Sequence, residues 1–200
     1  MKNPKICVIG LGYVGLPLAV EFAKYYTVTG FDTNSEKIND LKKGIDKTNE
    51  VSEKDLKKTK LRLTSNPKDI KESNFIIIAV PTPIDDSKKP NLKYVEDASK
   101  FVGKNLRKGA IVVYESTVYP GVTEEICLPI LEKESGTKCG KDFKIGYSPE
   151  RINPGDKDHT IDKIIKIVSG IDKESSDIIA KVYSKVIKAG VFKAKSIKTA

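Results

Sequence analysis

Short, almost wholly apolar segments alternate along the chain with longer segments in which apolar residues recur every three or four positions. A continuous apolar run such as Phe75–Val80 is typical of a strand buried on both faces of a parallel sheet. The recurrence at three and four, clearest over 172–187, is typical of a helix with one apolar face. This alternation predicts an α/β fold with a doubly wound, mostly parallel sheet and helices on both faces. We expect strands at 5–9, 27–31, 61–64, 75–80, 110–114, 143–147, 163–168 and 191–194.

One segment conflicts with a regular helix. Residues 121–134 have a helical composition, but Pro129 lies within them. A proline inside a helix removes a backbone hydrogen bond and clashes with the preceding turn. We therefore expect a kink or a late helix start near Pro129.

The first predicted strand runs directly into the glycine motif G-x-G-x-x-G at 10–15, and a helical pattern follows at once. Strand, glycines and helix together predict a Rossmann-type dinucleotide site. Gly10 allows the tight turn, Gly12 lets the backbone approach a pyrophosphate, and Gly15 lets helix and strand pack closely. The phosphates would then lie at the positive end of the helix dipole. The alternative is a glycine-rich turn that serves packing alone.

A carboxylate ends the second predicted strand. Asp32 lies about 20 residues beyond the glycines, where a βαβ unit places the acidic residue that binds the adenosine ribose. It would repel the 2′-phosphate of NADP, and no arginine follows closely, so NAD is the expected cofactor. Asp32 also suits a helix N-cap before Asn34. Lys37 lies close enough in sequence to approach the same ribose, although a plain surface lysine is an equal interpretation.

Further polar residues follow other predicted strands, at the sheet edge where ligands bind in such folds. Thr82, between two prolines, is a candidate for a fixed contact to the cofactor or a part of a proline-rich strand end. Thr117 offers a hydroxyl to a water or to the nicotinamide ribose. Glu150 is a candidate general base or water-orienting group. Arg151 is a candidate partner for an anionic ligand, although a surface ion pair between these two residues is the simpler alternative.

Composition and charge exclude some classes of binding partner. The net charge of +9 comes from scattered lysines and not from a basic stripe interleaved with aromatic residues, so we expect no nucleic-acid partner. No apolar run approaches the length of a membrane span and no signal peptide is present, so we expect a cytoplasmic protein without a membrane partner. Cys7, Cys127 and Cys139 lack metal-site spacing and are expected to be reduced thiols. His159, the only histidine, lies in a polar segment, which leaves no histidine-based triad.

The sequence resembles the amino-terminal, NAD-binding domain of the UDP-glucose/UDP-mannuronic-type nucleotide-sugar 6-dehydrogenases. The matching segments cover nearly the whole chain in order: GLGYVGLPLA from Gly10, FDTN from Phe31, VPTP from Val80, YESTVYPG from Tyr114 and YSPERINPGDKDHT from Tyr147. The last segment is the most specific. It is similar to the branch that acts on UDP-N-acetylhexosamines, whereas UDP-glucose dehydrogenases have an N-P-E-F-L run there.

The resemblance implies a four-electron oxidation of the sugar C6 alcohol to a carboxylate, with two NAD reduced in each turnover. It suggests a set of NAD contacts: Tyr13, Val14, Asp32, Lys37, Thr82 and Thr117. Thr117 and Glu150 would take part in catalysis, with Glu150 assisting the water and hemiacetal chemistry. Arg151 and Ile152 would border the UDP-sugar substrate.

The chain also departs from the family. The relatives use a cysteine in a G-G-x-C context and a lysine in a long central helix, and neither motif occurs in these 200 residues. We therefore expect an NAD-binding domain at 1–195, with 196–200 beginning a central helix that belongs to a longer enzyme, a homodimer when complete. The isolated chain would bind NAD but oxidise no UDP-sugar. The alternative is a non-catalytic, NAD-sensing Rossmann module.

Overall fold

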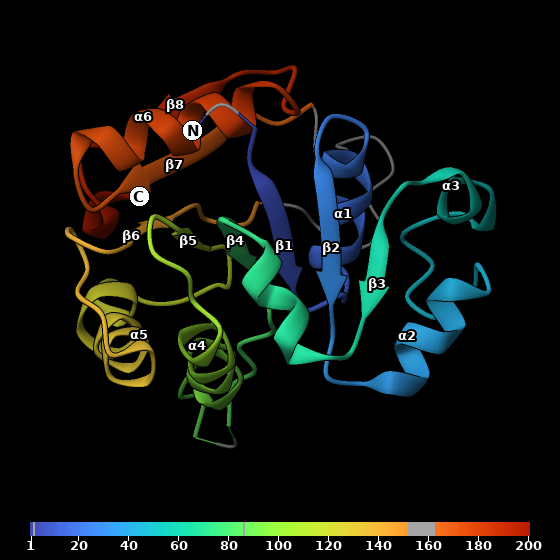
Figure 1. Cartoon of the computed structure of the whole chain (residues 1–200), viewed down its shortest axis with the longest axis horizontal. Coiled ribbons are helices and arrows are strands. Elements are labelled where there is room, and N and C mark those ends of the chain that lie inside the picture. The colour runs from blue at the N-terminus through green and yellow to red at the C-terminus, as the bar shows by residue number, and fades with distance from the viewer. Residues whose placement is uncertain (2, 86, 152–162) are drawn as a thin grey trace.

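An eight-stranded sheet runs through the centre of the computed structural model, which describes residues 1, 3–85, 87–151 and 163–200 (Figure 1). The strand order is β3-β2-β1-β4-β5-β6-β7-β8. The bounds are β1 Lys5–Ile9, β2 Thr27–Phe31, β3 Arg62–Thr64, β4 Phe75–Ile78, β5 Ile111–Tyr114, β6 Lys144–Tyr147, β7 Lys166–Gly170 and β8 Val191–Lys193.

The sheet reverses its direction of growth at β1. This strand pairs in parallel with β2 on one side and with β4 on the other, and the parallel pairing continues through β5 to β6. The prediction of a Rossmann-type, doubly wound and mostly parallel sheet is therefore confirmed. Ligands in such sheets bind beside the reversal point, beyond the carboxyl ends of the strands.

The seventh strand lies further along the chain than the sequence predicts. The expected bounds of 163–168 are wrong, since β7 covers Lys166–Gly170. Its ladder with β8 begins only where Lys166 lies opposite Val191. β7 is antiparallel to β6, and an apolar run carries no information about the direction of a strand.

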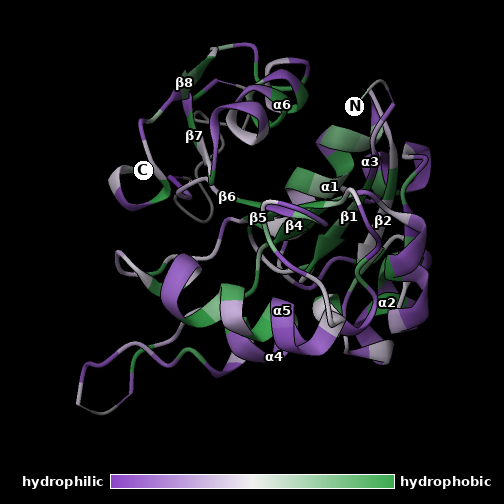
Figure 2. Ribbon diagram, turned by 60° about the vertical axis from the view of Figure 1, so that its left-hand side comes forward, coloured by the Kyte–Doolittle hydropathy of each residue, from purple (hydrophilic) through white to green (hydrophobic). Residues whose placement is uncertain are grey.

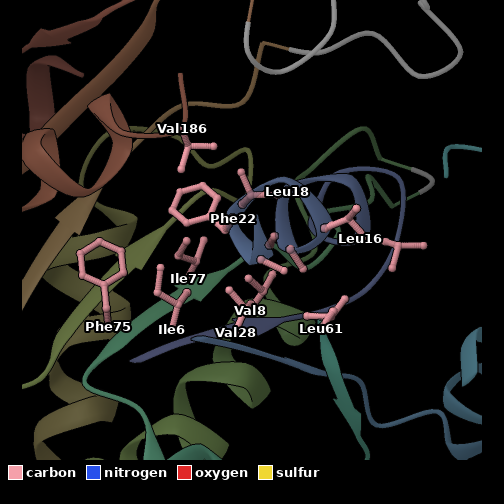
Figure 3. Packing of buried hydrophobic residues seen from close by; sticks show 14 of the residues in the cluster. Ile6, Val8, Leu16, Leu18, Phe22, Val28, Leu61, Phe75, Ile77 and Val186 are labelled. Carbon is pink, nitrogen blue, oxygen red and sulfur yellow. The ribbon is translucent and has the colours of Figure 1, made fainter. Parts of the chain in front are cut away.

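Helices cover both faces of the sheet, because successive strand residues point to opposite sides. Ile6 and Val8 pack with α1 (Gly15–Ala23) and α6 (Lys173–Ser184) on one face, as Figure 3 shows for the α1 side. Cys7 and Ile9 pack on the other face with α4 (Lys93–Lys104) and α5 (Leu128–Ser135). Figure 2 shows hydrophobic residues on the strands and hydrophilic ones along the outer side of α4. The remaining helical segments are α2 Ser35–Lys42, α3 Glu53–Lys58 and the 3-10 turns η1 Pro67–Glu72 and η3 Ile197–Thr199.

The segment around Pro129 behaves as its sequence predicts. Gly121 has a φ of +100°, and a π-helical turn, η2 (Val122–Cys127), follows it. The regular helix α5 begins only at Leu128, which places Pro129 in its first turn. A proline there lacks only an N–H group that would have had no intrahelical partner.

Candidate functional site

The glycine motif forms a tight loop between β1 and α1 at the reversal point of the sheet. Gly10 has a φ of +89° and its N–H donates to the Phe31 carbonyl at 2.8 Å. A Cβ on Gly10 would lie 2.8 Å from the Ala79 carbonyl oxygen, and one on Gly15 would lie 1.8 Å from the Gly10 carbonyl oxygen. Gly10 and Gly15 are therefore required by the close packing of the loop itself.

Gly12 is different, since a Cβ there would meet no described atom within 4 Å. Its φ lies outside the left-handed region, and the fold gives no internal reason for a glycine. The open space adjoins the start of α1, where Val14 is the N-cap and no described side chain caps the helix. An uncapped helix N-terminus offers N–H groups and a positive dipole to an anion. The space above Gly12 therefore fits the pyrophosphate of a dinucleotide.

Asp32 connects β2 to this loop. Its side chain, 11% exposed, accepts from the Leu11 N–H at 3.0 Å and from the Lys37 ammonium at 2.9 Å through Oδ2. Its Oδ1 accepts from the Asn34 N–H at 3.0 Å. The alternative interpretation of Asp32 as a helix N-cap is wrong, since Asn34 caps α2 by accepting from the Lys37 N–H. Lys37 thus lies against the carboxylate that is expected to bind the ribose.

A cleft of about 450 Å³ opens beside Asp32, between the ends of β1 and β2 and the helix α4. Phe31, Val80, Pro81 and Phe101 give it mostly apolar walls, and Asp32 and Lys37 lie at its polar side. A carboxylate beside apolar walls is the arrangement that a ribose and an adenine ring require.

The loop after β4 carries Thr82. Its hydroxyl oxygen is buried and has no hydrogen-bond partner within the described ranges. A buried polar atom without a partner is costly and is commonly explained by a missing ligand or water. This hydroxyl fits a contact to the cofactor, so the site as a whole suits NAD.

A second group of polar residues lies at the ends of β5 and β6. Thr117 is exposed there, and the Glu150 side chain is 8% exposed, with Oε2 3.2 Å from the Lys166 ammonium. The Arg151 N–H donates to Glu150 Oε1 at 2.7 Å, and the exposed Arg151 guanidinium lies 3.4 Å from the Ile165 carbonyl oxygen. The Glu150 carboxylate is thus ion-paired with the buried Lys166 ammonium, whereas the alternative interpretation had paired it with Arg151. Ile152 and His159 lie outside the described residues.

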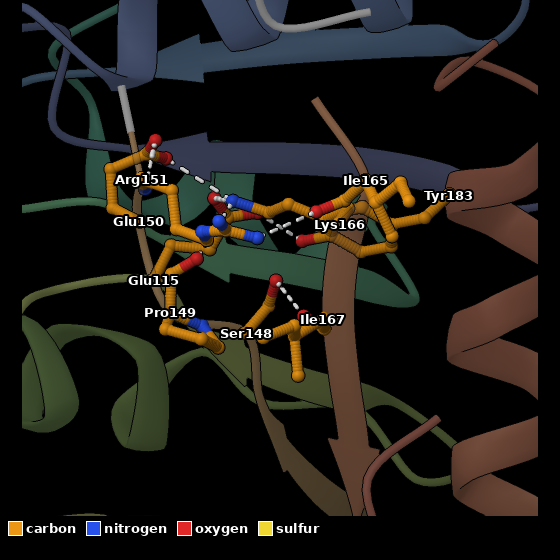
Figure 4. Close-up of polar contacts among 9 residues, drawn as sticks. All are labelled: Glu115, Ser148, Pro149, Glu150, Arg151, Ile165, Lys166, Ile167 and Tyr183. Atoms are coloured by element: carbon orange, nitrogen blue, oxygen red, sulfur yellow. Dashed lines mark hydrogen bonds and ion pairs between the residues drawn. The ribbon is translucent and has the colours of Figure 1, made fainter. Parts of the chain in front are cut away.

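Lys166 is a functional candidate that the sequence interpretation missed. Its side chain is 5% exposed and its ammonium lies 2.7 Å from Oε2 of Glu115, a carboxylate with no exposed side-chain surface. The Tyr183 hydroxyl donates to the other oxygen of Glu115. A single lysine within the apolar run at 164–168 is the one sequence feature that indicates such a pair. Figure 4 shows these side chains converging between β5, β7 and α6.

The cysteines do not resemble nucleophiles. Burial raises the pKa of the Cys7 thiol to about 12 and that of Cys127 to about 11. All three cysteines are free thiols, as the sequence predicted. The thiolate is the reactive form, so neither Cys7 nor Cys127 is suited to attack a substrate.

A sequence profile of the UDP-glucose/GDP-mannose dehydrogenase family, NAD binding domain, matches residues 4–187. The chain belongs to this family. It is the family's NAD-binding domain, in agreement with the cofactor that the glycines and Asp32 predicted.

Relatives within the family cover nearly all of the chain. Protein CapL of Staphylococcus aureus is 59% identical over 99% of the chain and 47% of its own length. The UDP-N-acetyl-D-glucosamine 6-dehydrogenase of Pseudomonas aeruginosa is 53% identical over 100% of the chain and 48% of its own length. The solved NDP-N-acetyl-D-galactosaminuronic acid dehydrogenase of Methanosarcina mazei superposes with a TM-score of 0.91 at 33% identity, over 98% of this chain and 45% of that one. The chain thus spans about half the length of the relatives that it matches.

No helix among residues 1, 3–85, 87–151 and 163–200 is long and apolar enough to cross a membrane. The same residues hold no group of three or more His, Cys, Asp or Glu side chains arranged to bind a metal ion.

Proposed function

We propose that the chain is the NAD-binding half of a UDP-N-acetylhexosamine 6-dehydrogenase, which oxidises the C6 alcohol of its UDP-sugar to the uronate. Two relatives at 53% and 54% identity are UDP-N-acetyl-D-glucosamine 6-dehydrogenases. The observation that carries the proposal is the pairing of an open Gly12 with a buried Asp32 beside an apolar cleft. NAD, when bound, supplies the hydride acceptor.

The proposed NAD contacts surround the glycine loop. The backbone at Gly12, Tyr13 and Val14 would bind the pyrophosphate, since an added Cβ at Gly12 meets open space. Asp32 would accept from the ribose hydroxyls, with Lys37 beside it. Thr82, with its unpartnered hydroxyl, and Thr117, exposed after β5, would contact the nicotinamide end.

The substrate side would be formed by the residues after β6. Glu150 would accept a proton or orient a water at C6, which is the role of a general base. Arg151 has an exposed guanidinium, and a guanidinium binds phosphate oxygens well. Arg151 and Ile152 would border the UDP-sugar. We propose that residues 1–195 form the domain, that 196–200 begin the central helix, and that the complete enzyme is a homodimer.

An NMR titration tests this proposal on the chain itself. We expect NAD to shift the backbone amides of Gly12 and Val14, and UDP-N-acetylglucosamine, added to the NAD complex, to shift the amide of Arg151. UDP-glucose serves as the matched control and is expected to perturb Arg151 less. NAD binding without any response to either sugar would favour the NAD-sensing module, and a lack of response to NAD would contradict both functions.

A further inference from the structure

The side chains of Lys166, Glu115 and Glu150, which are far apart in the sequence, meet in the interior of the protein. The Lys166 ammonium lies 2.7 Å from Glu115 Oε2, 3.2 Å from Glu150 Oε2 and 3.4 Å from the Pro149 carbonyl oxygen. The side chains of Lys166, Glu115 and Glu150 are 5%, 0% and 8% exposed. Figure 4 shows the lysine lying between the two carboxylates.

The topology explains how a lysine comes to lie there. Glu115 directly follows β5 and Glu150 follows β6, so both leave the sheet at its ligand-binding edge. β7 is antiparallel to β6, which returns its first residue, Lys166, to that same edge. The Tyr183 hydroxyl reaches the cluster from α6 and donates to Glu115 Oε1.

A structural ion pair alone does not account for this arrangement. Glu115 has no exposed side-chain surface and would suffice as the partner of one buried ammonium. The second carboxylate, Glu150, belongs to a loop after β6 and is also held by the Arg151 N–H at 2.7 Å. The Lys166 ammonium is already paired with Glu115, so it is available to hold Glu150 in place at the ligand-binding edge of the sheet.

We propose that Lys166 is a positioning residue that holds Glu150 in a fixed orientation toward the substrate, while Glu115 and Tyr183 anchor the ammonium. The role assigned to Glu150 rests on the proposed function. The contact network that orients it does not.

The electrostatics of the cluster agree with this role. Burial alone would lower the pKa of Lys166, but the two carboxylates outweigh it and raise the pKa, so the ammonium persists. Burial raises the pKa of Glu115, against the opposing effect of Lys166. Burial also raises the pKa of Tyr183 well above its usual value, which keeps its hydroxyl a donor.

The backbone amide of Arg151 is a built-in reporter, because its N–H donates to Glu150 Oε1. The experiment measures the chemical shift and the hydrogen exchange of the Arg151 amide proton at neutral pH in wild type, Lys166→Met and Lys166→Arg. The matched control is Lys144→Met, which removes a lysine of β6 that is ion-paired with Asp172 and Glu174. Thermal denaturation and an NAD titration accompany every variant.

We expect Lys166→Met to move the Arg151 amide proton upfield and to speed its hydrogen exchange, because Glu150 loses the contact that holds it beside this N–H. Lys166→Arg should restore most of the wild-type signature. Lys144→Met should lower stability without moving the Arg151 amide. An unmoved Arg151 amide in Lys166→Met would overturn the proposal, since a purely structural lysine changes stability alone.

The double variant Glu115→Gln/Lys166→Met covers the case in which Lys166→Met does not fold, because it leaves no stranded carboxylate at position 115. The same change of the Arg151 amide is expected in it, and an unmoved amide there would equally overturn the proposal. NAD affinity should be unchanged in all these variants. Failure of wild type to bind NAD would contradict the proposed function alone and leave the Arg151 result to decide the role of Lys166.

Discussion

Two glycines of the same loop are expected to respond to alanine in opposite ways. Gly15→Ala should destabilise the fold, whereas Gly12→Ala should leave stability intact and weaken NAD binding. Both substitutions add one methyl group within a few residues of each other, so each is the control for the other.

The magnitudes follow from the surroundings of each added methyl group. At Gly15 the carbon would lie 1.8 Å from the Gly10 carbonyl oxygen, so the backbone must move by about 1.2 Å to reach even 3.0 Å. Overpacking of this kind costs roughly 1–3 kcal/mol, which lowers Tm by roughly 2–12 °C in a chain of this size. At Gly12 nothing lies within 4 Å, and replacing an unstrained glycine stabilises by up to about 1 kcal/mol.

The expected loss of NAD affinity in Gly12→Ala comes from the methyl group occupying the space of the pyrophosphate. Charge-assisted hydrogen bonds contribute roughly 1.5–3 kcal/mol each, so losing one raises Kd about 10- to 100-fold. Thermal denaturation without cofactor and calorimetric titration with NAD separate the two effects. Wild-type NAD affinity in a stable Gly12→Ala variant would refute the assignment of this space to the cofactor.

Three further outcomes are expected. In the folded chain, Cys7 and Cys127 should resist iodoacetamide near pH 8 and react only after unfolding. Burial raises the pKa of Cys7 to about 12 and that of Cys127 to about 11, so almost no reactive thiolate is present. Mass spectrometry of the alkylated cysteines measures this difference. NAD should bind more tightly than NADP in parallel calorimetric titrations, because the Asp32 carboxylate lines the cleft and repels a 2′-phosphate. Absorbance at the NADH band should not rise when the chain is mixed with NAD and UDP-N-acetylglucosamine, because burial keeps the Cys7 and Cys127 thiols protonated. Robust NADH formation would contradict this expectation.

Much of the fold was predictable because its central strands are buried on both faces. Segments such as Phe75–Ile78 and Ile111–Tyr114 are buried along their whole length, so their continuous apolar run predicts a strand directly. The glycine loop was also predictable, because its glycines, the strand before them and the helix after them are contiguous in the sequence. Strong burial of the central strands and a contiguous glycine motif therefore made these elements predictable from the sequence.

The residues that the sequence interpretation missed depend on contacts between distant segments. Lys166 pairs with Glu115 across 51 positions, and Tyr183 reaches Glu115 across 68. No local pattern indicates that β7 runs antiparallel and returns Lys166 to the ligand edge. The ion pair of Glu150 with Lys166 has the same origin, since only the tertiary fold supplies the buried ammonium.

The most direct test of the account is a calorimetric titration of the chain with NAD, in wild type, Asp32→Ala and Asp177→Ala. Asp177 is an exposed aspartate ion-paired with Lys193 and serves as the surface control. We expect saturable binding to wild type and to Asp177→Ala. Asp32→Ala should bind about 10- to 100-fold more weakly, because a charge-assisted hydrogen bond contributes roughly 1.5–3 kcal/mol. No binding to wild type, or equal binding to Asp32→Ala, would contradict the account.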